Sequence, residues 1–336
     1  MPSISKILLV TAPVCAQIFA QQTFTNPPPP KEVTVNAIPG VIAAGAKWTL
    51  VWQGNANADG IVGTNDGGLL FAQEQLDQVS KLDKNGKYSA YLTNGHGPGA
   101  VTIGPKNRII VVERTCTDPG GHKGGNPAQC TDPTGVAALT PERKVLANSY
   151  NGKGLGRVND LIADKKGGVY LTSGGAYYIS PSGQVSTVGE NLRTNGITLS
   201  KDEKTLYITN GNTIAAFDVQ PDGSVKNQRE FAKLQPNGNG DGMMIDAEGR
   251  LYVTEPNLSI IEVFSTDGKS LGTIPAPRNC ITAAFSGPGK KTLYVAMMGA
   301  VGPDGKEIAT PPTVRNTAMS LYTIPMIASG FKGRAK

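Results

Sequence analysis

Residues 251–254 read LYVT, and five similar runs of β-branched and aromatic residues occur along the 336-residue chain. Each run follows a short turn rich in Gly, Asp or Lys. The other five are LLFA (69–72), IIVV (109–112), VYLT (169–172), LYIT (206–209) and LYVA (293–296). Their starts lie 40, 60, 37, 45 and 42 residues apart. Short strands and tight turns at a period near forty predict an all-β, six-bladed β-propeller.

The composition agrees with a turn-dense β protein. The chain has 42 Gly, 24 Pro and only 17% charged residues. Its formal net charge of +6 is modest for this length, and no Lys/Arg run or basic patch with interleaved aromatics occurs. These features argue against nucleic-acid binding.

We expect three regions along the chain. Residues 1–20 have a basic Lys6 followed by a short apolar stretch, the pattern of a cleavable signal peptide that is too short to span a bilayer. Residues 21–44 form a Pro-rich, extended N-terminal segment, and residues 45–330 form the propeller. The protein is therefore expected to be exported, either to the periplasm or outside the cell, with no transmembrane segment. A lipid anchor on Cys15 is the alternative.

Three cysteines follow the leader. In an oxidising compartment, Cys116 and Cys130 would close a loop disulfide within the long insertion 115–133 of the second blade. A metal cluster that also uses His122 is the alternative, although it lacks a fourth ligand. Cys280 precedes an apolar run and is expected to be a buried free thiol.

The residues that open the innermost strand of each blade should converge at one mouth of the central channel. Four of five such openings carry an oxygen-bearing side chain: Asp59, Asn159, Asn195 and Asp241. Two carboxylates and two amides form an oxygen-only donor set, which suits Ca²⁺ best among divalent cations. Mg²⁺ is an alternative, and so is Zn²⁺, although zinc prefers His or Cys ligands. The competing interpretation is that Asn, Asp and Gly recur because tight turns require them.

Three segments resemble the regucalcin and gluconolactonase family (senescence marker protein), whose members are six-bladed propeller lactonases. The segments are GRVNDLIADKKGGVYLTSGG (156–175), TNGITLSKDEKTLYITNG (194–211) and DGMMIDAEGRLYVTEPN (241–257). The resemblance covers about residues 55–298. It implies a divalent-ion site on Asn159, Asn195 and Asp241, and a substrate-holding role for Arg157.

Two positions depart from the pattern of this family. The glutamate of the first blade is Asp59 here, which is one methylene shorter. The polar residue that opens the second blade is replaced by Pro98, and His96, two residues earlier, is the candidate to substitute for it at the substrate. His122, on the insertion that should overhang the mouth, is a further candidate for binding substrate. Asp160 is expected to support the turn rather than to bind the ion.

The sequence therefore predicts a divalent-metal-dependent hydrolase that acts on a small molecule. The favoured activity is that of a lactonase for a sugar lactone or related cyclic ester. In this prediction, Asp241 activates the attacking water and the metal polarises the carbonyl. Two alternatives stay open: a phosphotriesterase that resembles diisopropyl fluorophosphatase at the same site, and a propeller that binds a ligand or calcium without catalysis.

Overall fold

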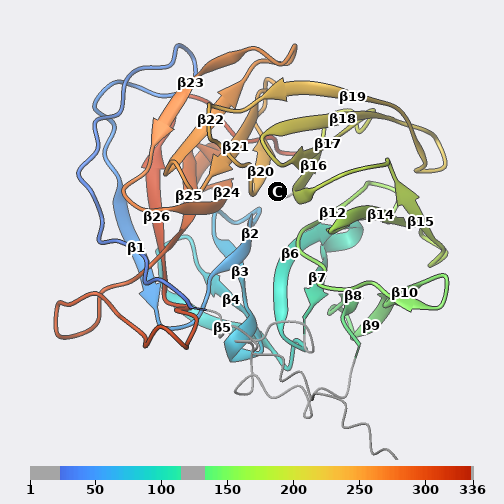
Figure 1. The fold of residues 1–336 in the computed structure, drawn as a ribbon, viewed down its shortest axis with the longest axis horizontal. Coiled ribbons are helices and arrows are strands. Elements are labelled where there is room, and N and C mark those ends of the chain that lie inside the picture. Colours follow the sequence, from blue (N-terminus) through green and yellow to red (C-terminus); the bar gives the residue numbers. More distant parts are fainter. Residues whose placement is uncertain (1–22, 115–132, 334–336) are drawn as a thin grey trace, which may run out of the picture.

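The computed structural model describes residues 23–114 and 133–333. Six antiparallel four-stranded sheets surround one axis, and strand is the dominant regular structure of the described chain (Figure 1). The prediction of an all-β, six-bladed propeller is confirmed. Helical structure in these residues is limited to 3₁₀ turns, which include η1 (Glu74–Leu76), η2 (Pro105–Asn107) and η5 (Pro288–Lys290).

The strands of each blade follow one another along the chain from the axis outward. Blade one has β2 (Asp59–Gly63), β3 (Leu69–Gln73), β4 (Gln78–Leu82) and β5 (Tyr88–Thr93). Blade two has β6 (Pro98–Gly104), β7 (Arg108–Glu113), β8 (Gly135–Ala138) and β9 (Lys144–Ala147). A small hairpin of β10 (Ser149–Tyr150) and β11 (Lys153–Gly154) then leads to blade three.

Blade three has β12 (Leu161–Ala163), β13 (Val169–Ser173), β14 (Gly175–Ile179) and β15 (Val185–Val188). Blade four has β16 (Thr194–Leu199), β17 (Thr205–Asn210), β18 (Thr213–Val219) and β19 (Val225–Lys233). Blade five has β20 (Met243–Ile245), β21 (Leu251–Glu255), β22 (Ile260–Phe264) and β23 (Ser270–Pro275).

Blade six joins the two ends of the domain. Its order from the axis outward is β24 (Cys280–Ser286), β25 (Thr292–Met298), β26 (Met319–Pro325) and β1 (Thr49–Gly54). The first strand of the chain pairs antiparallel with the last, from Thr49 opposite Thr323 to Gly54 opposite Met319. This pairing closes the ring and covers what would otherwise be a long exposed strand edge.

The six repeated runs are the second strands of the six blades: β3, β7, β13, β17, β21 and β25. They are mainly apolar because each is covered on both faces by its neighbouring blades. Six clusters of buried side chains fill the spaces between adjacent blades. The core of this protein is therefore a ring of inter-blade contacts, and these contacts fix where each inner strand begins.

The N- and C-terminal segments both pack on the ring. Residues 23–34 of the Pro-rich segment are mostly exposed, and the Phe24 amide donates to the Pro312 carbonyl, 2.7 Å, in the loop between β25 and β26. The rest of the segment turns at Ile38–Ile42 and buries Val35, Ile38, Val41 and Ile42 in the core. At the other end, the Gly330 amide donates to the Lys290 carbonyl, 2.8 Å, next to the turn between β24 and β25.

Cys280 is buried and unpaired, as predicted, and its thiol donates to the Ile260 carbonyl, 3.1 Å. Burial raises the pKa of this thiol to about 12, so it is unreactive. The predicted signal peptide, residues 1–20, lies outside the described residues, and so do Cys116, Cys130 and His122. Within the described chain, no helix is both long and apolar enough to cross a bilayer.

Candidate functional site

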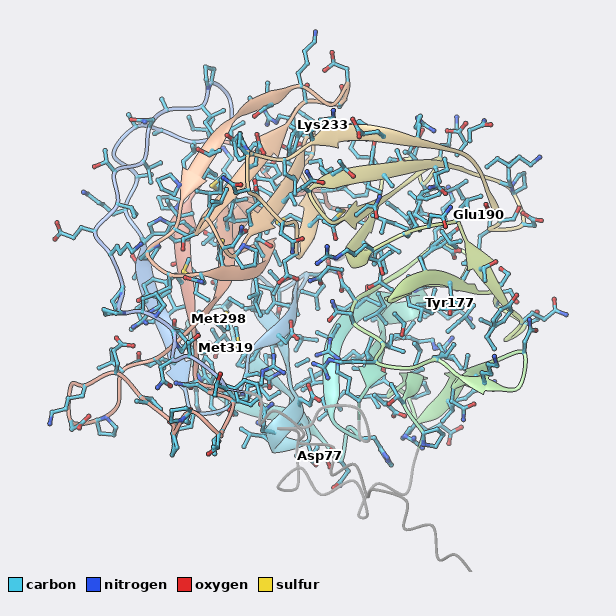
Figure 2. All side chains as sticks on the ribbon, viewed as in Figure 1. Asp77, Tyr177, Glu190, Lys233, Met298 and Met319 are labelled. Atoms are coloured by element: carbon cyan, nitrogen blue, oxygen red, sulfur yellow. The ribbon has the colours of Figure 1, made fainter. Side chains whose placement is uncertain are left out.

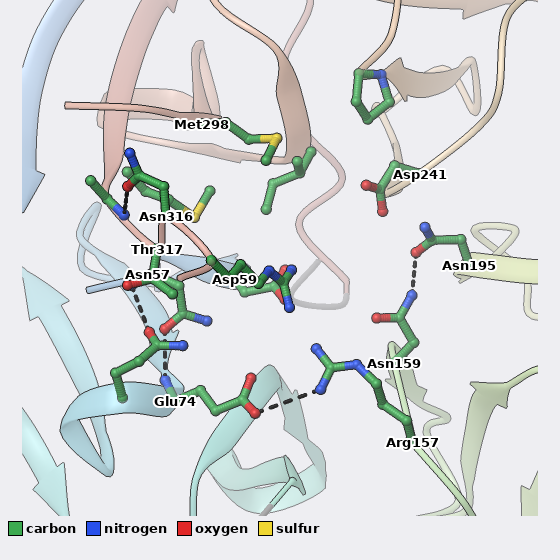
Figure 3. Close-up of a pocket in the computed structure, with 16 residues that line it drawn as sticks. Asn57, Asp59, Glu74, Arg157, Asn159, Asn195, Asp241, Met298, Asn316 and Thr317 are labelled. Carbon is green, nitrogen blue, oxygen red and sulfur yellow. Dashed lines mark hydrogen bonds and ion pairs between the residues drawn. The ribbon is translucent and has the colours of Figure 1, made fainter. Parts of the chain in front are cut away.

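A cavity of about 330 Å³ lies where the inner strands of several blades begin. The four candidate metal ligands and Arg157 all line it, and Figure 3 shows these side chains around the same space. The lining residues are Asn57, Asp59, Glu74, Gln75, Arg157, Asn159, Asn195, Asp241, Pro256, Ile281, Met298, Arg315, Asn316, Thr317, Ala318 and Met319. The structure thus brings together the residues that the repeat had placed at equivalent positions of blades one, three, four and five.

The glycine that follows three of these ligands has a separate task, which is close packing between blades. A Cβ atom on Gly60 would lie 2.2 Å from the Cα of Ala100 in blade two. A Cβ on Gly196 would lie 2.1 Å from the carbonyl oxygen of Asp241 in blade five. Glycine is therefore required by the neighbouring strand, while the preceding polar side chain is free to enter the mouth. A turn requirement alone does not explain this arrangement.

Threonines at the end of the repeated run also hold the site together. The hydroxyl of Thr254, in blade five, donates to the Ile281 carbonyl of blade six, 2.8 Å. Thr172, in blade three, donates in the same way to the carbonyl of Asn195 in blade four. These two bonds fix the backbone of one inner strand to the blade before it, and they account for the final threonine in two of the six runs.

Three of the candidate ligands form a hydrogen-bonded chain. The Asn159 amide donates to the Asn195 side-chain oxygen. Asn195 in turn is hydrogen-bonded to the Asp241 carboxylate. Figure 3 shows Asn159, Asn195 and Asp241 in this order along one wall of the cavity. The three side chains therefore lie next to one another in the cavity lining, with the Asn195 oxygen already accepting from Asn159.

Arg114 is the main residue that sequence reasoning missed. Its fully buried guanidinium donates from Nη1 to Asp59 Oδ2, 2.9 Å, and from Nη2 to Asn159 Oδ1, 2.9 Å. It therefore contacts two of the four candidate ligands. Burial alone would lower the pKa of Arg114, but the carboxylates of Asp59 and Glu74 outweigh it and raise that pKa above its usual value.

Glu74 was also missed, and it links the two arginines of the site. Its carboxylate lies 3.4 Å from Arg114 Nη1 and 3.6 Å from Arg157 Nη1. The Glu74 amide donates to the Asn57 side chain, 2.8 Å, which holds η1 against the start of blade one. Glu74 and Arg114 both follow directly after a second strand, β3 or β7. A search of the second-strand ends would have found them, since these ends lie on the same rim as the first-strand openings.

The electrostatics of Asp241 fit a bound cation. Burial raises the pKa of Asp241 well above its usual value, and the charges of Asp59 and Asp160 raise it further, against the opposing effects of Arg114 and Asn195. A cation beside this carboxylate would lower its pKa again. No three His, Cys, Asp or Glu side chains cluster as a metal site within the described residues, so such a cation depends on the amide oxygens.

The second blade departs from the pattern for a physical reason. A Cβ atom on Gly99 would lie 2.1 Å from Arg114 Nε, so the Pro98–Gly99 opening leaves room for this arginine rather than offering a polar group to substrate. His96 is partly buried and lies outside the set of cavity-lining residues.

Asp160 accepts from the amides of Leu161, 2.8 Å, and Ile197, 3.2 Å, which agrees with a supporting role.

The opposite wall of the cavity comes from blade six and is partly apolar. Met298 and Met319 are paired residues of β25 and β26, and Figure 2 shows them close together beside the channel. The loop between these strands adds Arg315, Asn316 and Thr317 to the lining.

A sequence model of the SMP-30/Gluconolactonase/LRE-like region matches residues 129–299, just over half of the chain. The chain belongs to this family. A gluconolactonase from Zymomonas mobilis is 25% identical over 302 residues, covering 76% of this chain and 78% of its own. A lactonase, drp35, from Staphylococcus saprophyticus is 33% identical over 138 residues, which are 36% of this chain and 42% of the lactonase. These names support a hydrolase.

Solved structures show the same fold at lower identity. A gluconolactonase from Xanthomonas campestris superposes with a TM-score of 0.66 at 19% identity, covering 91% of this chain and 96% of its own. A calcium-binding regucalcin from Agrobacterium tumefaciens superposes with a TM-score of 0.62 at 14% identity, covering 85% of this chain and 96% of its own. The family resemblance seen in the sequence is confirmed.

Blade five holds a buried pair of acids beside the cavity. Glu255 and Glu262 are almost fully buried, and among the described residues only Glu262 is a hydrogen-bond partner for the carboxyl group of Glu255. Burial, and then the charge of Glu262, raise the pKa of Glu255 to about 8. Near neutral pH, Glu255 and Glu262 therefore share one proton, which allows both carboxyl groups to be buried.

We expect Gly99→Ala to lower the free energy of unfolding by about 2 kcal/mol or more, because the new methyl group would displace the buried Arg114. Urea denaturation measures this change. Gly154→Ala is the matched control, since nothing lies within 4 Å of its Cβ position. Equal effects of the two substitutions would contradict the proposed packing of Arg114 over Gly99.

The Glu255 pair predicts a stability that falls as pH rises. In the folded protein the pKa of Glu255 is about 8, above its ordinary value of 4.5. Between these two pH values the folded state therefore holds a proton that the unfolded chain has already lost. The free energy of unfolding should therefore decrease from about pH 5 to pH 8 and then level off. Glu255→Gln should flatten this slope, measured by urea unfolding in EDTA. The exposed Glu248→Gln should leave it unchanged, and an unaltered slope in Glu255→Gln would contradict the assignment.

Proposed function

We propose that this protein is a divalent-metal-dependent lactonase that opens a sugar lactone or a related cyclic ester. The observation that carries the proposal is the convergence of Asn159, Asn195, Asp241 and Arg157 in one cavity. The names of the similar proteins, gluconolactonase and lactonase, support the same reaction class. A volume of about 330 Å³ suits a single small ring.

The donor set suits Ca²⁺, with Mg²⁺ as the alternative. Asn159, Asn195 and Asp241 would hold the ion through two amide oxygens and a carboxylate, which are hard ligands that zinc does not prefer. The calcium-binding description of the regucalcin neighbour favours the same ion. When bound, the cation supplies Lewis-acid polarisation of the lactone carbonyl.

The residues of this chain supply the remaining chemistry. In the proposed reaction, the Asp241 carboxylate accepts a proton from water as the water oxygen attacks the carbonyl carbon. The ring C–O bond then breaks, and the alkoxide takes up a proton to give a hydroxy acid. Arg157, held toward the cavity by its ion pair with Glu74, would bind ring hydroxyls or the new carboxylate. Asn159 and Asn195 keep Asp241 in position through their hydrogen-bonded chain.

We predict that Asp241→Asn lowers lactone turnover by about 10²- to 10⁴-fold, the range for loss of a positioned general base. A pH-drop assay over a panel of lactones, with calcium and with EDTA, measures the loss. Asp267→Asn, at an exposed turn of the same blade, is the control and should keep wild-type activity. Activity of Asp241→Asn within about tenfold of wild type would remove it from the base role.

The same assay separates the two alternatives. Turnover of paraoxon in place of every lactone would favour phosphotriester hydrolysis. Calcium binding without turnover of either class would favour a non-catalytic binding protein.

We also propose that the protein is exported to the periplasm or outside the cell. The support is the leader-like pattern of residues 1–20 and the Pro-rich segment that follows it. Intact-mass measurement of the protein from the periplasm or medium should show a chain shortened at its N-terminus by about twenty residues. Recovery of the full-length chain from the cytoplasm would contradict export.

A further inference from the structure

Arg114 places a fixed positive charge beside the candidate ion site. Its side chain is 1% exposed and is held from several directions. Nε donates to the Val158 carbonyl, 2.8 Å, and Nη2 donates to the Asn159 carbonyl, 2.5 Å, in addition to the bonds to side chains. The missing side chain at Gly99 leaves the space that the guanidinium fills. The guanidinium therefore cannot move away from the site without breaking buried hydrogen bonds.

Asp59 is the candidate ligand most affected. Its Oδ2 accepts from Arg114, 2.9 Å, and its Oδ1 accepts from the Gly60 amide, 2.9 Å. Both carboxylate oxygens are thus engaged by donors of the protein, and the negative charge is paired with a cation. The Asp241 carboxylate differs because its hydrogen-bond donor is the neutral amide of Asn195 rather than an arginine.

We propose that Arg114 pairs with Asp59 and so keeps this carboxylate out of the ion's ligand set. The guanidinium itself remains beside the ion site as a fixed positive charge. The ion is then held mainly by Asn195 and Asp241, with Asn159 oriented by the guanidinium. This inference rests on the proposed metal dependence. Because calcium affinity depends on the number of charged ligands, the site binds calcium weakly and leaves several coordination positions for water and substrate oxygens.

Isothermal titration with calcium chloride tests the assignment without an activity assay. Asp59→Asn should change the dissociation constant by less than about threefold, because its charge is already paired. Asp241→Asn should weaken binding by at least about thirtyfold, because it removes the carboxylate that directly faces the ion. Equal losses in the two variants would overturn the role given to Arg114, while the metal-dependent function would stand. Absence of calcium and magnesium binding to the wild type at millimolar concentration would overturn both.

A second pair of variants tests Arg114 itself. Arg114→Gln should release Asp59 to the ion and tighten calcium binding by at least about tenfold. The same substitution in an Asp59→Asn background should tighten it less, because no carboxylate is then released to the ion. Weaker binding in Arg114→Gln that keeps the wild-type circular dichroism spectrum would overturn the proposal. The comparison of Asp59→Asn with Asp241→Asn decides the proposal even where Arg114→Gln does not fold.

Discussion

The close approach of inner strands around the axis is the constraint on which the site depends. Neighbouring first strands come so near that Gly60, Gly196 and Gly242 have no room for a side chain. The residue before each of these glycines then projects into the mouth, where donors separated by many residues in sequence share one cavity. The same packing buries the second strands, which explains why the repeat is both apolar and regular. Site geometry and core packing are thus two results of one arrangement.

Buried charge is the second organising feature, and it is balanced locally. Arg114 offsets Asp59 and Glu74, Glu74 also faces Arg157, and Asp241 is left with only partial compensation. Charges in such an environment interact strongly because water does not screen them. In the proposal made above, this balance decides which carboxylate is available to a cation and which is already paired. One wall of the cavity is polar, and the other carries Met298 and Met319. A substrate with a polar side and an apolar side would therefore bind in one orientation.

Much of the fold could be predicted because its signal repeats. Six similar runs give the second strands of the six blades. Asp59, Asn159, Asn195 and Asp241 were also predictable, since they occupy equivalent positions in the repeat. Glu74 and Arg114 give a weaker signal, because each occurs once and only its place directly after a second strand points to the site. The candidate His96 is outside the cavity lining, for the reason that Arg114 and not substrate fills the space at the blade-two opening.

The sequence by itself determined the number of blades, the strands that build them and the four oxygen donors, because these depend on short patterns that recur with the period of the blade. Only the tertiary structure decided which donors are already paired, since Arg114 reaches Asp59 across 55 residues and Asn159 across 45. It also decided the apolar wall, which combines Pro256 and Ile281 with residues at the ends of β25 and β26. Contacts between different blades depend on how the ring closes, and no local stretch of the chain carries that information.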